Sequence, residues 1–145
     1  MILQTDKNLN AEIAAFGCYF CSCLAHAEKA TGKTFNAEDV LGIWGKAKAN
    51  GILGAECFVN DPIGLLALVG VKLNGVFKAE NSATPSGDGF ELLHFHRASD
   101  TPAGMGNAMH DHFVLGDGAG KVAFDPLGQS NTVKYGYLQN KRIFA

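Results

Sequence analysis

The sequence has 145 residues, which is enough for one domain with its own hydrophobic core. Its hydrophobic fraction of 47% and its charged fraction of 18% are ordinary for a globular protein. The net charge of −2 gives no electrostatic basis for binding nucleic acid or an anionic membrane surface.

The N-terminal stretch from Met1 to Lys7 lacks the basic and then apolar layout of a signal peptide. No apolar run approaches the length of a transmembrane span. We therefore expect a cytoplasmic protein whose four cysteines are reduced thiols and do not form a disulfide framework. We expect no cofactor, and the oligomeric state is left open by the sequence.

The first half of the chain carries helix signals. Asn10, Asn36 and Asp61 are suitable N-caps, and Gly32 and Gly51 stand where helices should end. The predicted helices cover residues 10–16, about 18–31, the stretch between Asn36 and Gly51, and 62 to about 70.

After Gly70 the pattern changes to short runs of β-branched and aromatic residues separated by turn signals. Helices followed by strands favour a single α+β domain with an antiparallel sheet. The predicted strands are Val71–Leu73, Val76–Phe77, Phe90–Arg97, His110–Leu115, Val122–Asp125, Val133–Tyr137 and Leu138–Phe144. The predicted loops are Glu80–Gly89 and Ser99–Gly106.

Cys18 follows Gly17 and opens the second predicted helix, whose apolar face recurs at helical spacing from Phe20 to Ala27. In the first turn, free backbone N–H groups and the positive end of the helix dipole favour an anion. A thiolate is such an anion, and it is the nucleophilic form of cysteine. A well-formed thiolate also needs a cationic partner, which is usually histidine.

A predicted hairpin in the second half supplies such a histidine. If its turn is centred between Gly118 and Ala119, residues whose numbers sum to 237 face each other, and His112 then pairs with Asp125. Directly opposed side chains lie about 5 Å apart on one face of the sheet. A carboxylate in that position fixes the imidazole tautomer and supports the imidazolium, as in a catalytic triad.

Gly17-Cys18 at a helix start, the distant run from His112 to Leu115, and Asp125-Pro126 after a hairpin occur in the same order in a known family. In these motifs the sequence resembles the papain-like cysteine peptidases. The closest resemblance is to the bacteriocin-leader-processing branch and its uncharacterised phage-encoded relatives.

The resemblance implies a papain-like domain over residues 1–145, with the N-terminal helices packed on a C-terminal antiparallel sheet. It implies that Cys18 is the nucleophile, that His112 is the general base and acid, and that Asp125 orients His112. The family also has an upstream glutamine whose amide helps to form the oxyanion hole. Gln4, fourteen residues before Cys18, is the only candidate for that role.

This interpretation predicts a thiol hydrolase that cleaves an amide bond, with a peptide or protein as substrate. The Cys18 backbone N–H, with Gln4, would stabilise the oxyanion. The loops Glu80–Gly89 and Ser99–Gly106 would flank the cleft over Cys18, because loops on a rigid scaffold carry specificity.

Two other functions remain open. His94 and His96 alternate along one predicted strand, and His110 and His112 along another, so neighbouring strands could surround zinc in a non-enzymatic, metal-binding protein.

The second alternative is thiol–disulfide exchange, because Cys18 and Cys21 form a Cys-x-x-Cys motif. That motif is typical of redox proteins when it follows a strand, whereas the residues before Cys18 predict a helix. Cys18 could also be a small core residue, since free cysteine is often buried. For Cys23 and Cys57 we expect the core.

Overall fold

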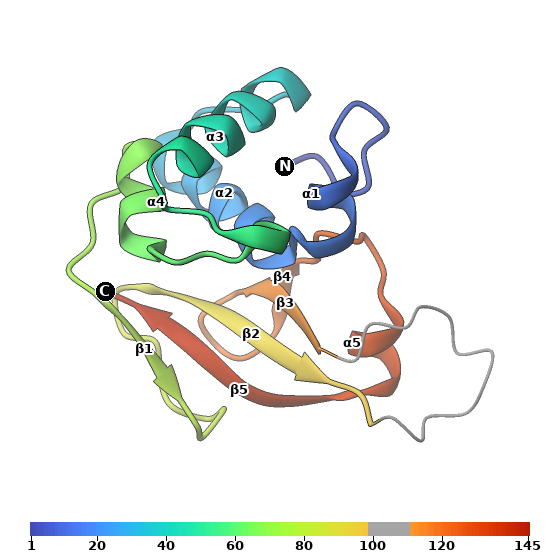
Figure 1. The fold of residues 1–145 in the computed structure, drawn as a ribbon. Coiled ribbons are helices and arrows are strands. Elements are labelled where there is room, and N and C mark those ends of the chain that lie inside the picture. Colours follow the sequence, from blue (N-terminus) through green and yellow to red (C-terminus); the bar gives the residue numbers. More distant parts are fainter. Residues whose placement is uncertain (99–110) are drawn as a thin grey trace.

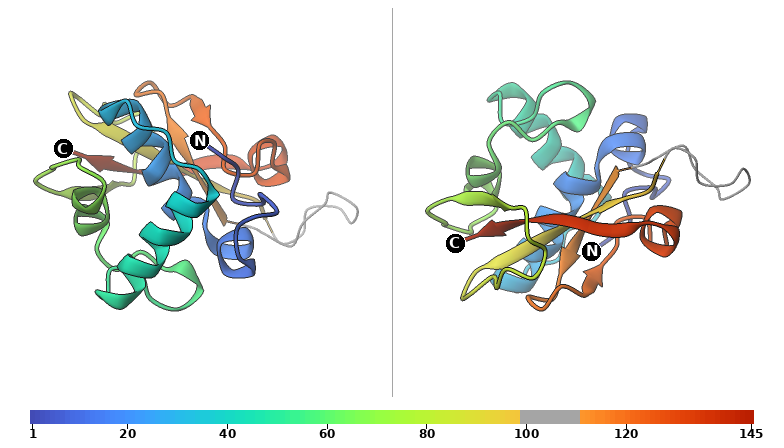
Figure 2. Two further views of the ribbon diagram at one scale, coloured as in Figure 1. Left: turned by 90° about the horizontal axis from the view of Figure 1, so that it is seen from above. Right: turned by 90° about the horizontal axis from the view of Figure 1, so that it is seen from below.

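The computed structural model describes residues 1–98 and 111–145 and has an α+β fold, as the sequence predicts (Figure 1). Four helices lie on one side of an antiparallel sheet, and two further views show the same two layers (Figure 2). The helices of the first half are α1 (Ala11–Phe16), α2 (Cys18–Thr31), α3 (Ala37–Ala49) and α4 (Pro62–Leu68), with the short 3₁₀ helix η1 (Ala55–Cys57) between the last two.

The sheet contains five strands in the order β1-β5-β2-β3-β4, and each neighbouring pair is antiparallel. The C-terminal strand therefore lies between β1 and β2, beside strands that precede it in the chain. The strands are β1 (Val76–Ala79), β2 (Phe90–His96), β3 (Asp111–Gly116), β4 (Val122–Phe124) and β5 (Tyr137–Phe144).

The helix boundaries agree with the capping signals. Asn10 accepts a hydrogen bond from the Ile13 N–H, and Asn36 forms a reciprocal capping box with Asp39. Asp61 caps α4 through the Gly64 N–H. Gly32 adopts a left-handed φ of 74° at the end of α2, which glycine permits without a steric penalty.

Two predicted strands are wrong. Residues 71–73 are not a strand, because the Val71 N–H donates to Leu66 O and continues the end of α4. Most of the predicted strand Val133–Tyr137 is instead the short helix α5 (Asn131–Tyr135), because the Ser130 hydroxyl accepts from the Val133 N–H and caps a helical turn.

The main core lies between α2 and the sheet. The predicted apolar face of α2 is completely buried, and it meets Leu92 of β2 and Phe144 of β5. That face consists of Phe20, Cys23, Leu24 and Ala27. The Ser22 hydroxyl also donates to the Phe113 carbonyl at 3.4 Å, which ties the early turns of α2 to β3. The start of α2 is thereby placed beside the start of β3.

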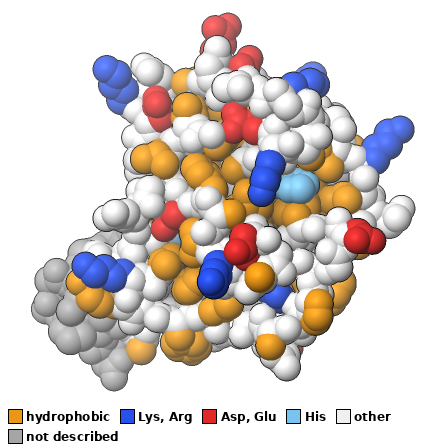
Figure 3. Space-filling model, turned by 180° about the vertical axis from the view of Figure 1, so that it is seen from behind, with side chains coloured by type: hydrophobic (Ala, Val, Ile, Leu, Met, Phe, Trp, Pro, Cys, Tyr) orange, Lys and Arg blue, Asp and Glu red, His pale blue; other side chains and the backbone are white. Residues whose placement is uncertain are grey.

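Two surface properties follow from the described residues. None of their helices combines the length and the apolar character that crossing a membrane requires. On the face drawn in Figure 3, acidic and basic side chains are interspersed, as the small net charge suggests.

Candidate functional site

Cys18 is the first residue of α2, and Gly17 immediately before it is required by packing. A Cβ atom at Gly17 would lie 2.5 Å from Ile13 O, so any side chain there would displace α1. Gly17 provides no side-chain cap for α2. The first backbone N–H groups of α2 therefore receive no cap from the side chain of the N-cap residue, and they lie at the positive end of the helix dipole. Cys18 is 9% exposed, whereas Cys21 and Cys23 are fully buried.

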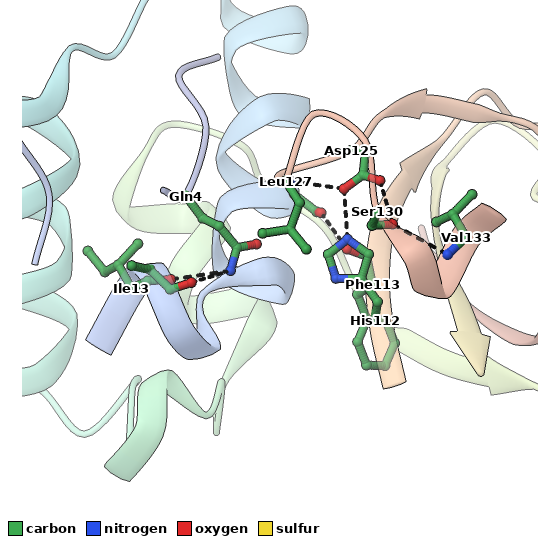
Figure 4. Close-up of polar contacts among 10 residues, drawn as sticks. Gln4, Ile13, His112, Phe113, Asp125, Leu127, Ser130 and Val133 are labelled. Atoms are coloured by element: carbon green, nitrogen blue, oxygen red, sulfur yellow. Dashed lines mark hydrogen bonds and ion pairs between the residues drawn. The ribbon is translucent and has the colours of Figure 1, made fainter. Parts of the chain in front are cut away.

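His112 and Asp125 form a buried pair. The His112 Nε2 atom lies 2.7 Å from Asp125 Oδ1, and the His112 side chain has no exposed surface (Figure 4). The same Oδ1 accepts from the Leu127 N–H at 2.9 Å, and Oδ2 accepts from the Ser130 hydroxyl at 2.8 Å. Because a carboxylate only accepts hydrogen bonds, Nε2 must carry a proton. The carboxylate thus has a full set of partners and a fixed orientation.

The His112 ring also interacts with the Cys18 thiol. Among the described residues, Nδ1 is buried and has no hydrogen-bond partner. Burial by itself would lower the pKa of His112, but the Asp125 hydrogen bond and the nearby Cys18 thiol outweigh burial and raise this pKa to about 9. Cys18 is therefore close enough to interact with the ring without forming a well-aligned hydrogen bond, as is common in substrate-free sites.

The pKa of Asp125 is shifted in the opposite direction, below its usual value. Burial works to raise the pKa of the Asp125 carboxyl, but hydrogen bonds from His112, Leu127 and Ser130 keep it below its usual value. At neutral pH the pair therefore consists of an imidazolium and a carboxylate.

The contact between His112 and Asp125 is as expected, but the predicted register is wrong. β3 and β4 pair Leu115 with Phe124 and Gly116 with Val122, with an irregularity between the two pairs, so partner numbers do not sum to 237. Asp125 lies just beyond the end of β4 and is not a ladder partner of His112. Its carboxylate is aimed at the ring by the hydrogen bonds of the turn that follows.

Gln4 is fully buried and connects the two halves of the site. Its Nε2 atom donates to Ala14 O at 3.0 Å and, more weakly, to Ile13 O at 3.4 Å, near the end of α1 (Figure 4). Its backbone N–H donates to Pro126 O at 2.9 Å, next to Asp125. These bonds give Gln4 a positioning role, and its role in an oxyanion hole stays a prediction.

A pocket of about 880 Å³ opens at Cys18. One side comes from the segment Ala55–Pro62, which sequence reasoning missed, and the other comes from β1, β3 and β5. The prediction that Glu80–Gly89 flanks the cleft is wrong, because none of its residues lines this pocket. Instead its Ser86 hydroxyl donates to Gly118 O on the β3–β4 turn. The predicted flanking loop Ser99–Gly106 lies outside the described residues.

Ser130 is the second functional candidate that the sequence analysis missed. The signal was the serine three residues before Val133, which is a helix-capping pattern, but Val133, Tyr135 and Tyr137 alternate and so suggested a strand. Identifying a helix there would have placed the Ser130 hydroxyl beside Asp125.

The remaining cysteines are buried thiols. Burial raises the pKa of Cys57 to about 12, and it also raises the pKa values of Cys21 and Cys23. The Cys18-x-x-Cys21 motif follows helix α1 and not a strand, and neither cysteine forms a disulfide.

The histidines of β2 interact with a carboxylate. His94 and His96 share one face, and both place a ring nitrogen within 2.9 Å of Asp111 Oδ1. Within residues 1–98 and 111–145 there is no group of three or more potential ligands arranged to hold a metal ion. The fourth histidine of the predicted zinc set, His110, lies outside the described residues.

A family model described as "Protein of unknown function, DUF261" matches residues 1–145. No curated protein and no solved structure matches the chain.

Proposed function

The chain belongs to the DUF261 family, and we propose that it is a thiol hydrolase that cleaves an amide bond in a peptide, with Cys18 as nucleophile. One observation carries the proposal. Asp125 holds Nε2 of His112, whose buried Nδ1 has no partner among the described residues and whose ring interacts with Cys18. A histidine that served only the fold would be expected to have both ring nitrogens paired when fully buried.

In the proposed reaction, the His112 imidazolium has taken its second proton, at Nδ1, from Cys18, and the sulfur attacks the substrate carbonyl carbon. Negative charge develops on the carbonyl oxygen, which the Cys18 backbone N–H can stabilise at the start of α2. His112 then gives its proton to the leaving amine as the carbon–nitrogen bond breaks. Water, deprotonated by His112, attacks the resulting thioester and releases the acid product with the free thiol.

Asp125 contributes in two ways to this cycle. It keeps Nε2 protonated, so that Nδ1 is the nitrogen that exchanges the proton with sulfur. It also stabilises the imidazolium form, which agrees with the raised pKa of His112. The hydroxyl of Ser130 and the N–H of Leu127 hold the carboxylate, so the ring cannot rotate without losing a buried hydrogen bond.

Thiol reactivity and peptide hydrolysis test the proposal together. Iodoacetamide at about pH 6 should label Cys18 first, because Cys18 interacts with His112, and the buried Cys57 should stay unlabelled as the internal control. His112→Ala should move Cys18 labelling to higher pH. A mixture of unstructured peptides should be cleaved by the wild type, and Cys18→Ala should lower the rate by about 10³-fold or more.

Cys21→Ala separates this proposal from disulfide exchange. It should retain hydrolysis, because Cys21 is fully buried and is not in the proposed triad. Uniform slow labelling of all four cysteines would contradict an activated nucleophile. If Cys18→Ala and Cys21→Ala reduced thiol–disulfide exchange to the same extent, that result would favour the exchanger.

A further inference from the structure

The pocket beside Cys18 has a continuous wall that leads from the thiol to a cation. Tyr19, the residue after Cys18, meets the ring of Phe113 edge-on, with centroids 5.0 Å apart. The guanidinium carbon of Arg142 lies 5.3 Å from the centre of the same Phe113 ring. All four residues line the pocket. Arg142 is also close enough to act electrostatically on the Tyr19 hydroxyl.

Arg142 has no carboxylate partner among the described residues. Its Nη1 atom donates to Asn140 Oδ1 at 2.7 Å, and Asn140 is itself buried. A guanidinium has five N–H donors, and this hydrogen bond uses one of them. Asp111, which lines the same pocket, is already bound by His94 and His96. Arg142 is thus a half-buried cation that has no carboxylate partner within residues 1–98 and 111–145.

Asn140 fixes the position of this cation. Its Oδ1 atom accepts from Arg142 and also faces Nδ1 of His94 at 3.1 Å, so the amide oxygen is held toward both groups. The arginine is therefore oriented by a buried side chain and by the Phe113 ring beneath it. An oriented guanidinium favours a planar carboxylate, which it can bind through two parallel hydrogen bonds.

The other pocket cation differs from Arg142. Lys78 is exposed and already forms a 3.0 Å ion pair with Glu80. On the helical side, Glu56 is exposed in the pocket and would repel an anionic ligand group there. Asp111 lines the sheet side of the pocket, but its carboxylate is bound by His94 and His96. Arg142, whose side-chain hydrogen bond goes to the neutral Asn140, is therefore the place for a negative group.

The rest of the pocket favours apolar groups. Phe58 and Phe77 line it and are 68% and 54% exposed, so two large aromatic side chains present apolar surface to a ligand in the pocket. The wall that carries Phe58 is held in place, because Lys48 Nζ bonds Gly54 O at 2.8 Å and Glu12 at 2.6 Å.

The backbone of this wall is also strained. Glu56 and Cys57 both have φ of 55°, a left-handed conformation that costs free energy for residues other than glycine. Such strain persists where the surrounding structure enforces it, and it commonly accompanies a ligand site.

We propose that Arg142 binds a carboxylate of the peptide substrate, while an adjacent large apolar side chain of that substrate packs between Phe58 and Phe77. The proposal names the substrate class of the hydrolase and rests on the proposed function. The carboxylate belongs either to an acidic side chain or to the C-terminus of the peptide.

Binding to the Cys18→Ala protein tests the subsite separately from catalysis. Fluorescently labelled peptides containing Phe-Glu with an amidated C-terminus, their Phe-Gln counterparts, and Phe-Gln peptides with a free C-terminus are titrated by anisotropy. Tighter binding of the first or the third peptide than of the second, by about tenfold or more, identifies the source of the carboxylate.

Arg142→Gln in the same background should remove that preference, and Arg142→Lys should retain only part of it, because lysine cannot form the two parallel bonds. Lys121→Gln, an exposed cation outside the pocket, should leave the preference unchanged. Equal affinity of all three peptides for the Cys18→Ala protein overturns the subsite without any variant of Arg142. Carboxylate-dependent binding without hydrolysis by the wild type would overturn the proposed function and leave the subsite standing.

Discussion

Two buried charge pairs in the sheet differ in how their hydrogen bonds are completed. In the first, Lys141 Nζ of β5 lies 2.6 Å from Glu91 of β2, and both side chains are almost fully buried. Glu91 Oε1 also accepts from the N–H groups of Gly118 and Gly120, at 3.0 and 2.9 Å. In the second, between His112 and Asp125, the carboxylate also accepts several hydrogen bonds, but Nδ1 of the imidazole has no partner in the part of the chain that the structure describes.

The difference separates a structural pair from a candidate catalytic pair. The Glu91 carboxylate holds the β3–β4 turn closed, and it packs so tightly that a Cβ at Gly116 would lie 2.6 Å from Glu91 Cγ. Neither Glu91 nor Lys141 lines the pocket at Cys18. A charge pair that does not line the pocket stabilises the fold, whereas a ring nitrogen of His112 without a partner among the described residues is available for proton transfer with Cys18.

The largest expected effect on stability comes from breaking the structural pair. Lys141→Met should lower the free energy of unfolding by about 3–5 kcal/mol, because Glu91 is then a buried charge without its partner. Urea unfolding measures this change. Peptide hydrolysis per folded molecule should stay near the wild-type value, since the pair does not touch the proposed site.

The double variant Glu91→Gln, Lys141→Met provides the control. It removes both charges and keeps an amide oxygen that can accept from Gly118 and Gly120, so most of the lost stability should return. If Lys141→Met has the same free energy of unfolding as the wild type, the pair of Glu91 and Lys141 contributes nothing to stability. The contrast with the pair of His112 and Asp125 would then be wrong.

The fold was predictable to the extent that local signals determine it. Asn10, Asn36 and Asp61 cap helices through contacts within three residues, so they were found directly. The pairing of Glu91 with Lys141 joins residues fifty positions apart, and no local pattern predicts it. The position of β5 between β1 and β2 is equally non-local.

For the candidate site, sequence reasoning identified His112 and Asp125 by a hairpin register that the structure does not have. The two side chains meet because the turn from Asp125 to Ser130 redirects the carboxylate, and that turn depends on a short helix cap. The pocket wall at Glu56 and Cys57 was missed because its left-handed backbone occurs at residues whose types do not signal it.

A smaller effect is expected from the pH dependence of the second pair. The folded-state pKa of His112 is about 9, above its ordinary 6.5, so its stabilisation is complete below about pH 6.5 and is lost as the pH rises through 9. The pKa of Asp125 is lowered from 3.8, so its stabilisation is present above about pH 4 and is lost as the pH falls through the lowered value.

Asp125→Asn should therefore lower the free energy of unfolding most between about pH 4 and 6.5, by on the order of 2–3 kcal/mol, and progressively less toward pH 9. Urea unfolding across this range measures the difference from wild type. Asp88→Asn, at an exposed loop position, should give a small and constant difference. A constant difference for Asp125→Asn would show that its charge does not stabilise the His112 imidazolium.

The smallest effect is expected at Gln4, which touches the segments on both sides of the proposed site. If it only positions α1, Gln4→Ala should lower the free energy of unfolding by about 1 kcal/mol and kcat by about tenfold, with little change in KM, because the hydrogen bond to Ala14 O is lost. An oxyanion donor behaves differently, since its removal costs about 10²–10³ in kcat.

The isosteric variant Gln4→Met separates these two roles. Methionine fills the same buried volume without an amide, so it should fold better than alanine, and under the positioning role it should recover part of kcat. Under the oxyanion role both variants would lose kcat equally.

The Oε1 atom of Gln4 is buried and unpaired among the described residues, so the amide already lacks one hydrogen bond. Replacing it should therefore cost less stability than removing a fully satisfied group such as the Glu91 carboxylate, whose loss would release two backbone N–H groups.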